Sequence, residues 1–195
     1  MGAHALARFE REVQLTAKLT HPNTITVYDY GRTPDGVFYY AMELIDGATL
    51  VDVVELSGPV PAARVARILR DVASALAEAH GAGVVHRDIK PANIMLCERG
   101  GLPDVVKVLD FGLVKQLDAH GGEAVTQANS ITGTPQYMAP EAITAPDSVD
   151  GRADLYALGA VGYFLLTGQH VFGGTSVVEV CSHHLHSAPV PPSER

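Results

Sequence analysis

The stretch HRDIKPANIM, residues 86 to 95, sets the interpretation of the whole chain. It places Asp88, Lys90 and Asn93 close together between short apolar runs. Transfer of a phosphoryl group to a hydroxyl needs a carboxylate that orients and deprotonates the alcohol, a cation for the phosphoryl charge, and oxygen ligands for magnesium. One loop with these three residues can supply all of these groups.

A second carboxylate follows the next apolar run. Asp110 begins the sequence Asp110-Phe111-Gly112, directly after VVKVL. A carboxylate oxygen is a preferred magnesium ligand, and Gly112 allows the backbone to turn sharply beside it. The sequence therefore predicts that Asn93 and Asp110 together hold Mg²⁺.

Local patterns predict an α+β fold. Two runs rich in β-branched and aromatic residues flank a turn with Pro and Gly, which is typical of a β-hairpin. Apolar residues at helical spacing, ended by glycines, mark the longest helix. The predicted helices cover 8–19, 49–56 and 59–80, with two further helical stretches after Pro140; the predicted strands cover 24–31, 37–44, 84–86, 93–96 and 105–110, and a long polar loop covers 115–134.

Composition limits the classes of function. The 195 residues carry a formal net charge of −8, which argues against binding to nucleic acid because phosphate contacts need Lys and Arg. The two cysteines, Cys97 and Cys181, are far apart and indicate a reducing, cytoplasmic setting. The most apolar run, 155–166, is too short for a membrane span and predicts a buried core helix. Any membrane anchor of a parent protein would lie in regions outside this chain.

Three motifs together resemble one family. HRDIKPAN (86–93), LDFG (109–112) and GTPQYMAPE (133–141) are similar to the catalytic loop, the magnesium loop and the substrate-binding segment of eukaryotic-type (Hanks-type) serine/threonine protein kinases, in a bacterial style. The resemblance implies a protein-kinase-like fold, with a remnant of the small lobe at 1–45 formed by the C-helix and a β-hairpin. It also implies a mainly helical large lobe at 46–186, which is incomplete, and a Pro-rich tail at 187–195.

The resemblance also implies ATP, Mg²⁺ and protein substrates with Ser or Thr acceptors. Asp88 would be the catalytic base, Lys90 would contact the γ-phosphate, and Asn93 and Asp110 would hold the metal. Adenine would be bound by backbone groups of Glu43 and Ile45, above Met95 and beside the gatekeeper Met42. The other implied site residues have structural or regulatory roles: Glu12 as the C-helix glutamate, His86 and Phe111 in the stacked spine, Asp154 beneath the catalytic loop, and Gly112, Thr134 and Glu141 in their motifs.

Regulation by phosphorylation is a further hypothesis. Arg87 offers a cation to a phosphate on the long loop, where Thr126, Ser130 and Thr132 carry the available hydroxyls. Charge-assisted hydrogen bonds of this kind can order a loop. The alternative is that these are ordinary loop hydroxyls.

Other features of the sequence depart from the family. No glycine-rich loop or strand lysine precedes Glu12. No late helix offers an arginine to pair with Glu141, and Thr16 occupies a position that is usually apolar. From these differences we expect weak or no catalysis by the 195-residue chain. The alternative function is a pseudokinase-like, truncated interaction module that uses the large lobe for docking.

A third class of function is metal binding at His183, His184 and His186. Imidazoles this close can hold zinc or nickel, with Cys181 and Glu179 as the nearest further ligands. Histidines of a polar surface helix are the simpler interpretation, and we prefer it.

Overall fold

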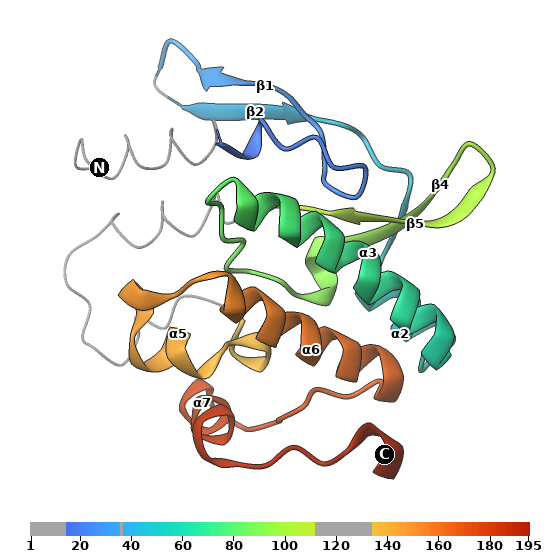
Figure 1. The fold of residues 1–195 in the computed structure, drawn as a ribbon, viewed down its shortest axis with the longest axis vertical. Helices are drawn as coiled ribbons and strands as arrows, with labels where there is room; N and C mark the ends of the chain where they lie inside the picture. Colours follow the sequence, from blue (N-terminus) through green and yellow to red (C-terminus); the bar gives the residue numbers. More distant parts are fainter. Residues whose placement is uncertain (1–14, 36, 112–133) are drawn as a thin grey trace.

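The computed structural model describes residues 15–35, 37–111 and 134–195. Figure 1 shows a β-hairpin at one end of the molecule, two long helices across its middle, and a shorter helix at the opposite end. The sheets are small and antiparallel, and most of the described chain after them is helical. The predicted α+β class is confirmed.

The hairpin consists of β1 (Val27–Arg32) and β2 (Phe38–Met42), which pair antiparallel with Tyr30 opposite Tyr40. The predicted hairpin is therefore present, with shorter strands than the pattern indicated. Ahead of it, Leu15 and Thr16 form the end of the first predicted helix and a turn follows at 17–18. The earlier residues of this predicted helix lie outside the described part of the chain.

A short strand and two helices follow the hairpin. β3 (Gly47–Thr49) leads directly into α2 (Leu50–Ser57), which begins with a capping box: the Thr49 hydroxyl accepts from the backbone of Asp52, and the Asp52 carboxylate accepts from the backbone of Thr49. α3 (Ala62–Gly81) is the long amphipathic helix that the sequence predicted at 59–80.

Three strands form the second sheet. β4 (Ile94–Arg99) pairs antiparallel with both β3 and β5 (Leu102–Val108). The predicted strand at 84–86 is wrong, because these residues join no sheet. The backbone N–H of His86 is instead bonded to a side chain from a distant helix, so it is not available to a neighbouring strand.

Three helices complete the described fold, where the sequence predicted two stretches. α5 (Pro140–Thr144) is a short helix, α6 (Gly151–Thr167) is capped by the Asp150 side chain and ends at Gly168 in the left-handed region, and α7 (Val177–His186) is capped by Ser176. Short 3-10 turns occur at η1 (Pro91–Asn93), η2 (Pro135–Tyr137), η3 (Pro146–Ser148) and η4 (Pro192–Glu194). No helix in the described ranges is both long enough and apolar enough to cross a membrane.

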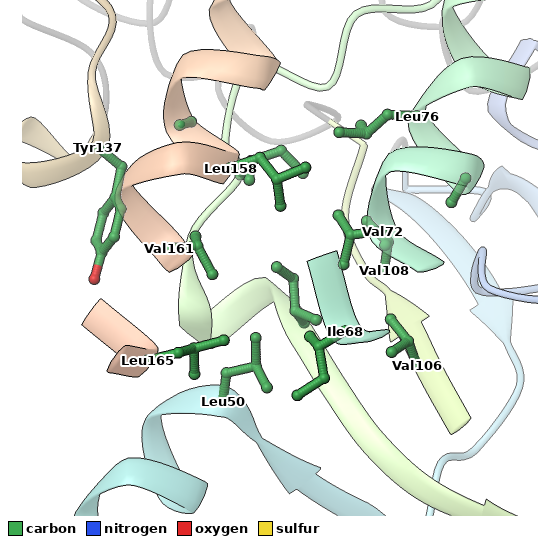
Figure 2. Packing of buried hydrophobic residues seen from close by; sticks show 14 of the residues in the cluster. Leu50, Ile68, Val72, Leu76, Val106, Val108, Tyr137, Leu158, Val161 and Leu165 are labelled. Carbon is green, nitrogen blue, oxygen red and sulfur yellow. The ribbon is translucent and has the colours of Figure 1, made fainter. Parts of the chain in front are cut away.

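One apolar core joins the two long helices to the second sheet. Figure 2 shows side chains of α3 and α6 meeting between the helices, with residues of β5 and α2 beside them. The predicted burial of residues 155–166 holds for most of α6, although Leu155 itself is 52% exposed. The labelled members of this core are Leu50, Ile68, Val72, Leu76, Val106, Val108, Tyr137, Leu158, Val161 and Leu165.

We expect the core to be sensitive to loss of volume on α6. Leu165 is completely buried, so Leu165→Ala should lower the free energy of unfolding by about 2–5 kcal/mol through lost burial and a residual cavity. Leu155→Ala on the same helix removes the same atoms from an exposed site and should change stability by less than about 0.5 kcal/mol. Urea unfolding of both variants measures the difference; equal losses would contradict this packing.

Candidate functional site

A buried carboxylate on α6 holds the loop that carries the predicted catalytic residues. Asp154 is 1% exposed, and it accepts hydrogen bonds from the backbone N–H groups of His86 and Arg87, each at 2.8 Å. The Nε2–H of His80 donates to the same carboxylate at 2.7 Å. The loop backbone is therefore fixed by a side chain 68 residues further along the chain.

His86 is locked as a neutral ring. Its Nε2–H donates to the carbonyl of Leu109 at 2.8 Å, and its Nδ1 accepts from the backbone N–H of Asp88 at 3.2 Å. Complete burial lowers the pKa of His86, against the opposing charges of Asp154, Asp88 and Asp110. The ring also contacts that of Phe111, with centroids 4.6 Å apart, so the two loops that carry Asp88 and Asp110 are joined through this pair.

Four polar side chains meet at the loop itself. Lys90 Nζ lies 3.0 Å from Oδ2 of Asp88 and donates to the Thr134 hydroxyl at 3.2 Å. Asn93 Nδ2 donates to the Asp88 carbonyl at 2.9 Å and to its carboxylate at 3.1 Å. Three residues predicted as catalytic, together with the predicted motif residue Thr134, therefore share one hydrogen-bond network, although Thr134 is 44 residues from Lys90.

The groups predicted to bind magnesium fit a hard cation. Both partners of Asn93 Nδ2 are acceptors, which assigns the amide nitrogen to Asp88 and makes the amide oxygen the atom that a metal would contact. The backbone of Asn93 also accepts from the N–H of Leu109, next to Asp110, at 2.9 Å. An amide oxygen and a carboxylate are ligands of the kind that Mg²⁺ prefers.

Asp110 has a partner that the sequence did not indicate. The hydroxyl of Tyr40, on β2, donates to Asp110 Oδ1 at 3.2 Å. Burial, followed by the charge of Asp110, raises the pKa of Tyr40 above its usual value of 10.0, so the phenol remains a neutral donor. Asp110 itself has a positive φ of 44°, which is uncommon for a residue other than glycine.

The segment predicted to bind adenine joins the hairpin to β3. The N–H of Glu43 donates to the Thr26 carbonyl at 2.9 Å, so the Glu43 backbone group that remains for a ligand is its carbonyl. Met42 is 40% exposed, whereas Ile45 is half-buried. Met95 is half-buried on β4, opposite Thr49 of β3.

The side chain of Glu43 fixes this segment from within. Its carboxylate accepts from Lys107 at 2.6 Å and from the Thr26 N–H at 2.9 Å, and it also pairs with Arg99. Burial alone would raise the pKa of Glu43, but the hydrogen bonds from Lys107 and Thr26 outweigh it, and the pKa is lowered. Lys107 is the buried cation that interrupts VVKVL, and this interruption was the available sequence signal.

Several predicted site residues are separate from this network or outside the description. Glu141 lies in the first turn of α5, and its charge helps to raise the pKa of Tyr156, after the larger effect of burial. Thr16 is buried, and its hydroxyl has no hydrogen-bond partner among the described residues. Glu12, Gly112, Thr126, Ser130 and Thr132 lie outside the described residues, and their roles stay predictions, as does phosphate binding by the exposed Arg87.

Two histidines of α7, His183 and His184, both contact the Phe172 ring but have different polar partners. His184 is buried and contacts the Tyr156 hydroxyl through Nδ1 at 2.7 Å. His183 stacks on Phe172, and its Nδ1 lies 2.9 Å from the Ser187 hydroxyl. Across the ranges that the structure describes, no group of three or more His, Cys, Asp or Glu side chains is placed to hold a metal ion.

His80 is another residue that the sequence analysis missed. It lies at the end of α3 and reaches Asp154, and it can do so because Gly151 has no side chain: a Cβ there would lie 2.6 Å from His80 Nδ1. No local sequence pattern predicts this contact, because only the packing of α3 on α6 brings the two residues together.

Comparison with known proteins identifies the family that the fold and the motifs indicate. The model of the protein kinase domain family matches residues 3–191, so the chain belongs to the protein kinase family. The family resemblance given by HRDIKPAN, LDFG and GTPQYMAPE is thereby confirmed.

The relatives are bacterial. The chain is 45% identical over 191 residues to the serine/threonine-protein kinase pkn3 of Myxococcus xanthus, covering 97% of this chain and 35% of the relative. It is 44% identical to the serine/threonine-protein kinases PknB of Mycolicibacterium smegmatis and Mycobacterium tuberculosis, covering 96% of this chain and 30% of each relative. The chain thus spans about a third of the length of the curated relatives it matches.

Replacement of Asp154 should destabilise the loop that carries the predicted catalytic residues. In Asp154→Asn, the amide NH₂ faces a backbone N–H and leaves a buried donor unsatisfied, which should cost about 1–3 kcal/mol of unfolding free energy. Asp150→Asn is the matched control, because Asn also caps helices well and Asp150 is exposed. Urea unfolding distinguishes the variants. An unchanged free energy of unfolding for Asp154→Asn would show that the buried carboxylate does not stabilise the loop.

Stability should fall as the pH drops below the ordinary histidine pKa of 6.5. His86 has a lowered pKa when folded, so below this pH the unfolded chain binds more protons than the native state. His170 and His184 act in the same direction because burial lowers their pKa values too. For each such histidine, the free energy of unfolding falls by at most about 1.4 kcal/mol for each unit decrease in pH.

Urea unfolding between about pH 7.5 and pH 5.5 measures this effect. The pKa of Glu43 is lowered in the folded protein, so its contribution to stability is lost only at pH values below 4.5. The histidine and Glu43 contributions are therefore lost in different pH ranges. Constant stability down to about pH 5.5 would contradict a neutral, buried His86.

Proposed function

We propose that this chain is the catalytic portion of a serine/threonine protein kinase, which transfers the γ-phosphate of ATP to Ser or Thr hydroxyls of protein substrates. The observation that carries the proposal is the shared network of Asp88, Lys90, Asn93 and Thr134. It combines a carboxylate, a cation and a metal-binding amide with a hydroxyl from the substrate-binding segment.

Asp88 is the proposed base. Its carboxylate is oriented by Lys90 and Asn93, and its backbone N–H is held by His86, so its position is fixed before a substrate arrives. It would accept the proton of the substrate hydroxyl as the oxygen of that hydroxyl bonds to phosphorus, while the bond from phosphorus to the leaving diphosphate breaks. Lys90, beside Asp88, supplies positive charge for the phosphoryl oxygens.

Asn93 and Asp110 are the proposed magnesium ligands. A bound Mg²⁺ would supply positive charge that neutralises phosphate oxygens. For adenine, we propose the carbonyl of Glu43 and the backbone of Ile45, with Met42 and Met95 as apolar neighbours. The anchoring of Glu43 by Thr26, Lys107 and Arg99 supports this role, because it holds the segment in one position.

The Ser/Thr class rests on the Lys90–Thr134 contact and on the relatives. Thr134 lies beside Lys90 in the same network as Asp88, where a small aliphatic hydroxyl of a substrate would meet the proposed base. The relatives with 44–45% identity carry serine/threonine-protein kinase names. For the chain, we therefore propose protein substrates with Ser or Thr acceptors.

The test is transfer of labelled γ-phosphate from ATP to a generic Ser/Thr protein substrate such as casein. Asp88→Asn should lower the rate about 10²–10⁴-fold, the usual contribution of a general base. Asp35→Asn, in the exposed turn of the hairpin, should leave the rate unchanged. Transfer by the unaltered protein is expected to be weak, because of the departures from the family noted in the sequence. A complete absence of transfer that depends on Asp88 would favour the docking module instead.

A further inference from the structure

The contact between Tyr40 and Asp110 joins parts of the chain that are 70 residues apart. Tyr40 belongs to the small hairpin, whereas Asp110 follows β5 of the other sheet. The Tyr40 ring is half-buried, and its hydroxyl lies 3.2 Å from Asp110 Oδ1. The neighbouring Tyr39 is 43% exposed, and its hydroxyl reaches Asp29 at 3.4 Å. Alternation along the strand therefore gives the two tyrosines different partners.

The carboxylate of Asp110 depends on this contact for its orientation. Within the described residues, Tyr40 is the hydrogen-bond partner of Asp110, and it engages Oδ1. Asp110 lies beyond the end of β5 and has a positive φ, so its backbone is not held by strand pairing. A neutral donor on one carboxylate oxygen directs the other oxygen elsewhere without neutralising its charge.

We propose that Tyr40 is a positioning residue for magnesium: its hydroxyl orients the Asp110 carboxylate as a metal ligand. The inference rests on the proposed function, in which Asp110 binds Mg²⁺. Partners that hydrogen-bond to a metal-ligating carboxylate orient it, and their loss typically weakens metal affinity about 10- to 100-fold. Tyr40 has this position relative to Asp110.

A consequence is that the small hairpin takes part in the metal site. Tyr40 lies opposite Tyr30 in the hairpin, and the hairpin is tied to the Glu43 segment by the Thr26 contacts. Any movement of the hairpin away from β5 would remove the donor from Asp110. Metal affinity is therefore coupled to the placement of the hairpin over the large lobe.

The experiment measures how Mg²⁺ promotes the binding of a fluorescent ATP analogue to the whole chain, independently of catalysis. Tyr40→Phe keeps the ring and removes only the donor, so it should raise the half-saturating Mg²⁺ concentration about tenfold while leaving analogue affinity at saturating Mg²⁺ nearly unchanged. Tyr39→Phe makes the same chemical change on the same strand and should have no effect. Urea unfolding of the three proteins verifies that each is folded.

Asp110→Asn separates this inference from the proposed function. If Asp110→Asn raises the Mg²⁺ requirement but Tyr40→Phe leaves it unchanged or lowers it, the positioning role is overturned and the metal site stands. If Asp110→Asn has no effect, or the unaltered chain binds no analogue, the proposed function itself fails. An equal effect of Tyr39→Phe would also overturn the inference, because the effect would then arise from any hydroxyl loss on β2 and not from the contact with Asp110.

Discussion

The geometry of the loop that carries the proposed catalytic residues depends on one buried carboxylate. Asp154 lies on α6 and faces this loop, and it accepts hydrogen bonds from the backbone N–H groups of His86 and Arg87 and from the Nε2–H of His80. Buried charge is costly unless it is fully hydrogen-bonded, and three donors meet that requirement here. The same bonds satisfy the backbone N–H groups of His86 and Arg87, so the end of the irregular run 84–86 is held without joining a sheet.

The apolar core gives this interaction its position. α3 packs on α6 and on β5, so the end of α3, the loop after it and the first turn of α6 have fixed relative places. His86 connects this loop to the next one, because its ring hydrogen-bonds to the Leu109 carbonyl and packs against the Phe111 ring. A rigid core is thus connected to Asp88 and Asp110 by a short series of directional contacts, and this arrangement suits a reaction that relies on positioning and charge.

Two further sets of contacts connect the hairpin and the segment after it to the second sheet and to Asp110. Glu43 joins the segment after β2 to Lys107 of β5 and to Arg99 of β4, and Tyr40 joins β2 to Asp110. Both contacts involve an acidic group near the proposed nucleotide site, and both cross between segments far apart in the sequence. Polar contacts as well as apolar packing therefore set the relative placement of the regions proposed to bind adenine and metal.

The sequence by itself determined the motifs and hence the family, the α+β class, the hairpin, the long helix α3 and the buried character of most of α6. These features follow from local residue order and periodicity, which need no knowledge of distant partners. It predicted Asp88, Lys90 and Asn93 as one group because a single loop carries them. Only the tertiary structure decided that residues 84–86 form no strand, that His80 supports Asp154, that Glu43 pairs with Lys107 and Arg99, and that Tyr40 contacts Asp110. The physical reason is that these are hydrogen bonds and ion pairs across long sequence separations, whose partners meet only after the helices and sheets have packed.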